Sequence, residues 1–404
     1  MIIKCRLCNR PLRKFFSLGR LPLANSYLKK SQLRRTSKYD LSVGFCSNCL
    51  LVQLMKSLPP EKLFRKYLYF SSTSQSFLAH SKKTAQFLKR KLRLNSDSLV
   101  LEIASNDGAV LKYFQELGVR VIGIDPARNI AKIANSNGIK TIPEFFNYSM
   151  ALKLFKKRLT ADLVYGANVL AHVPGILDFV KGVKFILKQK GTVVFEFPYI
   201  KGLLEGKFDT IYHEHFFYYS LLALTNLFRK AGLVIYDVKM TPLQGGSLQI
   251  FISHPNVFIT SNRVHKLLKK ETSEGFHKLA TYKKLSITVD NLKKELLELL
   301  KRLRQNNKSV AAYGAPAKGN TLLNFFGIGK NYLDFIVDKS PAKQGSFTPG
   351  THLLIESPKV IMERKPDYLL ILCWNIYKEI LEDCRSYKKA GGKFIVPIPK
   401  LRII

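Results

Sequence analysis

From Ser98 onward the chain alternates short apolar runs with stretches of helical length, and this alternation is the strongest constraint on its fold. Such a pattern is typical of an α/β protein in which helices connect the strands of an open sheet. The predicted strands of a central sheet are Leu99–Ile103, Val119–Ile124, Asp162–Ala167, Thr192–Phe197, Leu233–Val238 and Leu248–Ser253. A second series follows at Val310–Tyr313, Leu333–Val337, Tyr368–Leu372 and Phe394–Ile398. The sequence therefore predicts two α/β units.

Between the two series, apolar residues recur every three or four positions, at Leu285, Val289, Leu292, Leu296, Leu299 and Leu303. This spacing predicts one long amphipathic helix that joins two lobes. A shorter, basic amphipathic helix is expected at about 77–91. We therefore predict an α/β fold of three units. They are a small cysteine-bearing module at 1–72, a central Rossmann-like domain at 73–281, and the linker helix with a second, C-terminal Rossmann-like domain at 282–404.

The N-terminal module contains two CxxC pairs, Cys5 with Cys8 and Cys46 with Cys49. Each CxxC turn can present two thiolates to one cation, and two such turns complete a tetrahedral site. Zinc suits four sulfur ligands, so we predict a closed, structural zinc site, with a redox CxxC as the alternative. Cys373 and Cys384 lie far away in the sequence and are interpreted as ordinary thiols.

The 404 residues carry a formal net charge of +38, and the basic residues are scattered along the chain instead of clustered. This charge reflects either a lysine-rich composition or a preference for anionic substrates or partners. No apolar run approaches the ~18 residues of a membrane span, the N-terminus has no apolar signal stretch, and cysteines are sparse. We therefore predict a cytoplasmic protein without a membrane partner, and we favour a monomer.

A loop after the first predicted strand has the form of a nucleotide-binding turn. Ala104, Asn106 and Gly108 occupy the small-residue positions of a GxGxG loop. Glu102 precedes the loop, and Asp125, 23 residues further on, can accept hydrogen bonds from ribose hydroxyls. The acidic Asp107 would repel a pyrophosphate but suits the cationic sulfur of S-adenosylmethionine. We favour that cofactor over NAD and over a purely structural turn. The expected cofactor contacts are Glu102, Ala104, Ser105, Asn106, Gly108, Asp125, Pro126 and Asn168.

The third strand ends near Asn168 and His172, which are expected to face the crevice beyond the carboxyl ends of the strands. A lone histidine is more often a structural hydrogen-bonding group. In the C-terminal unit a strand runs into the glycine-rich stretch Gly314–Thr321, which includes Lys318 and Asn320. Such loops attract phosphate, so Lys318, Asn320 and the later Lys343 are candidates for binding a nucleotide diphosphate. The alternative is a vestigial nucleotide fold that serves only as a wall.

Besides the cysteine pairs, the chain contains a series of ordered motifs. These are Leu23–Tyr27, Cys49–Leu54, Tyr67–Ser72, Glu102–Gly108, Asn168–Pro174, Glu196–Tyr199, Phe208–His215, Gly245–Leu248 and Tyr313–Asn324. Through these motifs the sequence closely resembles, over essentially its whole length, the sugar C-methyltransferases that act on nucleotide-linked 4-keto deoxysugars. Departures from the family pattern at Gln244, Gln249 and Pro316 fall on the expected substrate side.

The resemblance implies an N-terminal zinc-binding domain, a central methyltransferase domain and a C-terminal Rossmann-like domain. It implies that S-adenosylmethionine donates a methyl group to C3 of the sugar and that His215 acts as the base. Tyr212, Glu214 and His172 match other active-site positions of the family, and an early active-site tyrosine matches either Tyr67 or Tyr69. Tyr199 joins Lys318, Asn320 and Lys343 as an expected substrate contact.

Methylation at carbon requires a base beside a ketone, donors aimed at the enolate oxygen, and a methyl sulfonium held in line. Neutral His215 can supply the base, Glu214 or another polar neighbour can orient it, and Tyr212 and His172 are candidate donors. A metal site using His213 and His215 is a weaker hypothesis, because it needs a third ligand. A zinc-containing RNA methyltransferase is the alternative function, although we do not expect a nucleic-acid partner, and a non-catalytic scaffold is a third.

Overall fold

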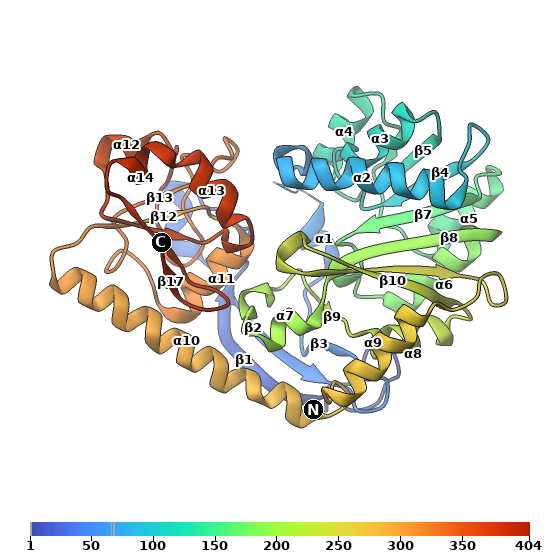
Figure 1. The fold of residues 1–404 in the computed structure, drawn as a ribbon, viewed down its shortest axis with the longest axis horizontal. Helices are drawn as coiled ribbons and strands as arrows, with labels where there is room; N and C mark the ends of the chain where they lie inside the picture. Colours follow the sequence, from blue (N-terminus) through green and yellow to red (C-terminus); the bar gives the residue numbers. More distant parts are fainter. Residues whose placement is uncertain (1, 66, 68) are drawn as a thin grey trace.

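The structure is a computed structural model that describes residues 2–65, 67 and 69–404. The described chain forms three sheets (Figure 1). The methyltransferase-like unit lies on the right in this view, the C-terminal unit lies on the left, and the blue N-terminal strands run beneath and between them. The α/β fold class is confirmed. Within the described residues, every helix is too short or too polar to span a lipid bilayer.

The central sheet has seven strands in the order β10-β11-β8-β7-β4-β5-β6, all parallel except β11, which is antiparallel to both neighbours. Its strands are β4 (Leu99–Ile103), β5 (Arg120–Ile124), β6 (Thr141–Ile142), β7 (Ala161–Ala167), β8 (Leu187–Pro198), β10 (Val234–Thr241) and β11 (Ser247–Ser253). The first series of predicted strands is therefore confirmed, and β6 is an additional short edge strand. Ile103, Val164 and Val193 are among the apolar side chains that these strands bury, as parallel strands covered on both faces require.

Helices connect and cover this sheet. They are α2 (Gln75–Leu92), α3 (Ala109–Glu116), α4 (Arg128–Ser136), α5 (Tyr148–Lys156), α6 (Ile176–Ile186), α7 (Ile200–Leu204), α8 (Leu221–Lys230) and α9 (Asn262–Ser273). The expected basic helix is α2, which begins where the Ser74 hydroxyl accepts a hydrogen bond from the backbone of Phe77.

The N-terminal sheet is antiparallel and contains β1 (Arg13–Pro22), β2 (Lys38–Phe45), β3 (Val52–Leu54) and β9 (Phe217–Tyr218). The short helix α1 (Pro60–Phe64) follows β3 in the chain. Strand β9 lies in the segment that we expected to belong wholly to the central domain, yet it pairs with β3 through Val52 and Tyr218. The short segment between Phe208 and Tyr218 is therefore held between two sheets. This sharing of a strand fixes the N-terminal module against the methyltransferase unit.

The predicted linker helix is present as α10 (Leu279–Gln305), which runs along the lower edge of the molecule in Figure 1. Its buried stripe includes Leu285, Val289 and Leu292, and it packs on β1. The ring of Tyr282 lies 4.8 Å from that of Phe45, centroid to centroid. The helix thus spans from the N-terminal sheet to the C-terminal unit.

The C-terminal sheet has the order β14-β13-β12-β15-β16-β17 and is parallel except for β17. Its elements are β12 (Val310–Tyr313), α11 (Ala317–Phe326), β13 (Ile336–Val337), β14 (Ile355–Glu356), α12 (Val360–Arg364), β15 (Tyr368–Ile371), α13 (Tyr377–Asp383), α14 (Arg385–Lys389), β16 (Lys393–Val396) and β17 (Arg402–Ile403). The predicted second series is present, with β13 shorter than expected because only Ile336 and Val337 pair with both neighbours.

Candidate active site

A cavity of about 880 Å³ lies where the three units meet. Its walls come from the carboxyl ends of β4, β5 and β7, from the segment around His215, from Asn25 and Tyr27 of the N-terminal module, and from the loop after β12. Ligands of open α/β sheets bind beyond the carboxyl ends of parallel strands. The cavity therefore joins the ligand-binding edge of the central sheet to the corresponding edge of the C-terminal sheet.

At the central edge, the loop between β4 and α3 has an unusual backbone that brings main-chain atoms to the cavity. Ala104, Asn106 and Gly108 have positive φ values of 59°, 51° and 81°. Gly108 also lies against Ile139, where a β-carbon would meet the side chain at 2.9 Å. Asp125, directly after β5, accepts hydrogen bonds from the backbone N–H of Asn106 and of Ala127, both at 2.9 Å. The predicted loop and its acidic partner are thus one hydrogen-bonded unit.

This crevice is acidic and contains buried polar atoms without a hydrogen-bond partner. Within the described chain, Glu102 Oε2, Ser105 Oγ and Asp107 Oδ1 are such atoms. Burial raises the pKa of Glu102 well above its usual value, and the negative charges of Asp125 and Asp107 raise it further. Burial also raises the pKa of Asp125 to about 6. Orphaned acceptors and mutually repelling carboxyls fit a ligand that carries positive charge and hydroxyl groups, as S-adenosylmethionine does.

Two further predicted cofactor positions, Pro126 and Asn168, line the same cavity. Asn168 follows β7 with a φ of 58°, and its backbone N–H donates to the carbonyl of Glu196 at 2.6 Å. This bond fixes the end of β7 against β8. All the predicted cofactor residues except Gly108, which packs against Ile139, therefore line one end of the cavity.

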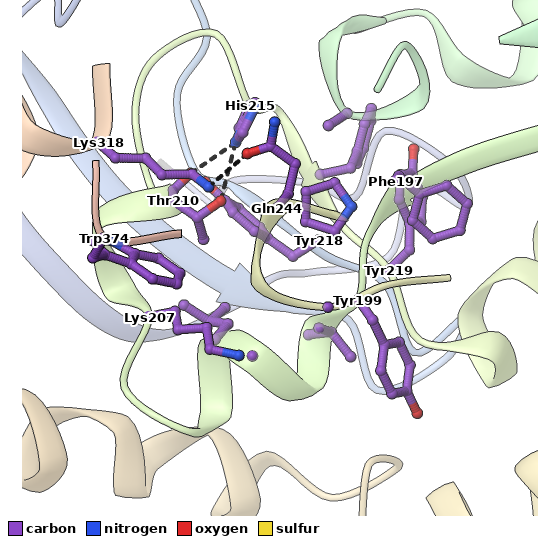
Figure 2. Close-up of a pocket in the computed structure, with 17 residues that line it drawn as sticks. Phe197, Tyr199, Lys207, Thr210, His215, Tyr218, Tyr219, Gln244, Lys318 and Trp374 are labelled. Atoms are coloured by element: carbon purple, nitrogen blue, oxygen red, sulfur yellow. Dashed lines mark hydrogen bonds between the residues drawn. The ribbon is translucent and has the colours of Figure 1, made fainter. Parts of the chain in front are cut away.

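His215 follows a short 3-10 turn, is buried and lines the cavity; Figure 2 shows it with the other residues of a small adjoining pocket. Its Nδ1 lies 2.8 Å from the carbonyl oxygen of Thr210, which can only accept a hydrogen bond, so we assign the proton to Nδ1. Nε2 is then an acceptor, and it lies 2.6 Å from the hydroxyl of Tyr212. Burial lowers the pKa of His215 well below its usual value, and the nearby His172 and Lys318 lower it further. The imidazole is therefore neutral, and its lone pair lies on Nε2.

His172 lies beside His215, with ring centroids 4.8 Å apart. Burial lowers the pKa of His172 to about 4, and its Nδ1 is buried without a partner in the described chain. His213 instead lies 3.2 Å from the backbone oxygen of Tyr39, outside this pair. The only group of potential metal ligands in the described residues is the four cysteines, so the structure does not support a metal held by His213 and His215.

Glu214 does not contact His215, although we considered it as the residue that orients the base. Its carboxylate accepts hydrogen bonds from Asn25 at 2.8 Å and from the hydroxyl of Tyr67 at 3.0 Å. Burial raises the pKa of Glu214 to about 7, and these two bonds partly oppose that rise. The contacts of Tyr67 thus differ from those of Tyr69. Tyr69 is 45% exposed, and its backbone oxygen accepts a hydrogen bond from Asn106 of the cofactor loop. Asn25 was missed because nothing in its local sequence links it to Glu214.

The C-terminal end of the cavity is built around the turn from β12 into α11. Asp338, after β13, accepts hydrogen bonds from the backbone of Ala315 at 2.8 Å and from Lys343 at 3.1 Å. Lys318 also lines the cavity, and its ammonium donates to Gln244 at 3.0 Å. Lys339 lines the cavity as well and pairs with Asp383, so three lysines of the C-terminal unit lie in the wall.

Two predicted substrate contacts lie elsewhere. The Tyr199 hydroxyl donates to Glu271 at 2.7 Å, and the side chain points away from His215 in Figure 2. Asn320 donates to the backbone oxygen of Ala24 at 2.7 Å and is not part of the cavity wall. Tyr199 borders only a small adjoining pocket, so the structure does not bring either residue to the main cavity.

The four N-terminal cysteines converge on one point. The Sγ atoms of Cys5 and Cys49 are 3.5 Å apart, those of Cys8 and Cys46 are 3.4 Å apart, and all four lie within 4.8 Å of one another. A tetrahedron with metal–sulfur bonds of about 2.3 Å has sulfur–sulfur edges of roughly 3.8 Å, so the cluster fits zinc. The amide of Gln53 donates to Cys5 Sγ at 3.1 Å and supports that ligand from outside. With four protein ligands, zinc here is structural.

Comparison with known proteins agrees with this geometry. Family models match as a zinc-binding domain at residues 5–64, a methyltransferase domain at 74–238 and a C-methyltransferase C-terminal domain at 242–399. The chain belongs to the family of S-adenosylmethionine-dependent C-methyltransferases that have these three domains. It is 36% identical over 408 residues to the C-methyltransferase NovU of Streptomyces niveus, an alignment that covers 100% of this chain and 97% of NovU.

Solved structures show only a distant likeness. Magnesium protoporphyrin IX methyltransferase from Synechocystis, solved with bound S-adenosylmethionine, aligns with 49% of this chain and 98% of its own, at 12% identity and a TM-score of 0.36. A methyltransferase from Anabaena variabilis aligns with 43% of this chain and 84% of its own, at 14% identity and the same TM-score of 0.36.

Proposed function

We propose that this C-methyltransferase transfers the methyl group of S-adenosylmethionine to C3 of a nucleotide-diphosphate-linked 4-keto-deoxysugar. The observation that carries the proposal is one continuous cavity. The acidic cofactor crevice lies at one end, a neutral buried histidine lies in the wall, and the C-terminal unit contributes Lys318, Lys339 and Lys343. A cationic methyl donor, an acidic C–H and an anionic diphosphate match these three regions in charge and order.

His215 is the group that takes the proton. Its Nδ1–H bond to Thr210 leaves Nε2 with the lone pair, and Tyr212 holds that nitrogen in the absence of substrate. Removal of a C–H proton beside a ketone places negative charge on the carbonyl oxygen, so the site must supply donors there. His172 is one candidate donor. It lines the cavity, and its Nδ1 is buried without a hydrogen-bond partner in the described chain.

Glu214, Tyr67 and Asn25 form a second hydrogen-bonded group in the cavity wall. Because Asn25 and Tyr67 belong to the N-terminal module and Glu214 to the central unit, these bonds position the N-terminal module against the segment that contains the base. S-adenosylmethionine, when bound, supplies an electrophilic methyl group on a sulfonium. The carboxyls of Glu102 and Asp125 would hold that cofactor.

The test is a screen of purified protein with S-adenosylmethionine against dTDP-, UDP-, GDP- and CDP-linked 4-ketosugars, read as a mass gain of one methyl group. His215→Asn is expected to lower turnover at least ~1,000-fold, because proton abstraction loses its base, while S-adenosylmethionine binding by calorimetry stays unchanged. The matched control is His254→Asn, which changes a histidine outside the cavity wall. Full activity of His215→Asn would refute the base assignment.

An RNA methyltransferase remains the second candidate because the chain carries a net charge of +38. That function requires tight, salt-dependent RNA binding. The same protein preparation can be titrated with a labelled RNA at several salt concentrations. Methylation of RNA, with no methylation of any nucleotide sugar, would favour this alternative.

A further inference from the structure

Lys318 reaches from the C-terminal domain into the part of the cavity that contains the base. It lies in the first turn of α11, and it lines both the main cavity and the small adjoining pocket that His215 also borders. Figure 2 shows its ammonium pointing toward the space between His215 and Gln244. The positive charge is close enough to His215 to contribute to the lowered pKa of that histidine. Lys318 is therefore near the reacting atoms.

The surroundings of Lys318 fix the position of its ammonium; burial lowers its pKa from the usual value, and the negative charge of Asp209 opposes that change. Nζ donates to the amide oxygen of Gln244 at 3.0 Å and lies 5.2 Å above the ring of Trp374. The indole N–H of Trp374 donates to Asp209 at 2.6 Å. No carboxylate in the described chain lies within 4.0 Å of Lys318 as an ion pair. An ammonium has three N–H donors, and the contact with Gln244 uses one of them.

The residues assigned so far to the proposed reaction include no cationic group that could donate to the carbonyl oxygen. Tyr212 has a single hydroxyl proton, and in this structure it is engaged with His215 Nε2. His172 can offer at most a neutral N–H. A preorganised charged donor stabilises a developing oxyanion more strongly than a neutral one.

We propose that Lys318 is a catalytic residue whose ammonium donates a hydrogen bond to the sugar carbonyl oxygen as enolate charge develops there. The inference rests on the proposed function. Nε2 of His215 takes the proton from the carbon beside the ketone, and the C–H electron pair forms the C–C π bond. The carbonyl π pair moves onto oxygen, where Lys318 stabilises it and keeps its own proton. As that carbon forms its bond to the methyl group, the C–S bond breaks and its electron pair stays on sulfur, which leaves S-adenosylhomocysteine. The oxygen pair then re-forms the carbonyl, and His215 releases its proton to water.

This assignment gives Lys318 and Lys343 different roles, while the third lysine of the cavity wall, Lys339, pairs with Asp383. Lys343 is held by Asp338 and by the carbonyl of Ala315, both at 3.1 Å, at the end near α13. It remains the candidate for binding the diphosphate. Lys318 is therefore assigned to the reacting oxygen instead of to phosphate. Its replacement should lower the saturated rate of proton abstraction and change KM little.

The experiment measures proton abstraction without methylation. Protein, S-adenosylhomocysteine and the panel sugar that is methylated in the screen above are mixed in deuterated water, and exchange of the acidic C–H is followed by mass spectrometry. Lys318→Met should lower the saturated exchange rate ~100- to 1,000-fold, with the sugar KM changed less than ~3-fold. Lys318→Arg should lose about 10-fold, because it keeps the charge with different geometry.

The matched control is Lys293→Met, since Lys293 also lies 5.3 Å above an aromatic ring, Phe325, but is outside the cavity wall. Zinc content and S-adenosylmethionine binding check folding, and Lys318→Arg serves if the Met variant does not fold. Exchange by Lys318→Met at the wild-type rate would overturn the proposal, as would a change in KM alone. Absence of exchange in the wild type, or exchange by His215→Asn, would instead overturn the proposed function.

Discussion

The two Rossmann-like crevices that face each other across the cavity use the same backbone device. In the central sheet, Asp125 accepts one hydrogen bond from the loop after the first strand and one from the residue two positions ahead, Ala127. In the C-terminal sheet, Asp338 accepts from Ala315 of the corresponding loop and from Ser340, also two positions ahead. The four distances are 2.8–2.9 Å. Topology therefore fixes the position of the acidic residue in both crevices.

The charges around the two aspartates differ. Within the described chain, neither Asp125 nor Glu102 forms a salt bridge, and burial raises the pKa of both. Asp338, by contrast, pairs with Lys343 at 3.1 Å. The central crevice is thus left acidic and suits a cationic ligand. In the C-terminal crevice Lys343 balances the charge of Asp338, and Lys318 lines the same cavity. The comparison shows that one topology can accept ligands of opposite charge, because ligand charge is decided by a few side chains and not by the sheet.

The strongest test of this comparison is a pair of matched substitutions. Asp125→Asn should weaken S-adenosylmethionine binding roughly 30- to 150-fold, since hydrogen bonds to a charged acceptor contribute about 2–3 kcal/mol. Asp338→Asn, the same change in the other crevice, should leave that affinity within about 3-fold. Calorimetric titration of both variants measures the difference. Equal weakening by the two substitutions would show that the crevices do not bind separate ligands.

A second test removes the balancing cation. Lys343→Met should raise the KM for the nucleotide sugar about 10-fold or more, because the diphosphate loses a charged donor and Asp338 is left unpaired. We expect kcat to change less than about 3-fold, because Lys343 lies away from the base. Steady-state kinetics separate the two constants. Lys308→Met, which removes the exposed pair with Asp367 in the same domain, is the control. An unchanged KM would remove Lys343 from the substrate site.

Local pattern predicted most of the fold and only part of the site. Apolar periodicity located β4 and α10, and the spacing of the cysteines predicted their convergence, because each depends on neighbours in sequence. The pairing of Asn25 with Glu214 joins residues 189 positions apart and follows from how the units pack. The same holds for β9, whose two residues carry no strand pattern of their own but complete the N-terminal sheet.

The smallest expected effect is a pH dependence confined to the acidic crevice. Because burial raises the pKa of Asp125 from 3.8 to about 6, this carboxyl gains a proton as the pH falls through 6 and can no longer accept two hydrogen bonds from ribose hydroxyls. At pH 5.5 about one quarter of the group is ionised, so S-adenosylmethionine should bind roughly 4-fold more weakly than at pH 7.5. The unliganded protein has the opposite dependence, since a raised folded-state pKa costs stability as the pH rises from about 4 through 6. Calorimetry at the two pH values, with Asp125→Asn as the variant that lacks this titration, measures the effect. An equal pH dependence in Asp125→Asn would assign it to another group, with Glu102 as the next residue to replace.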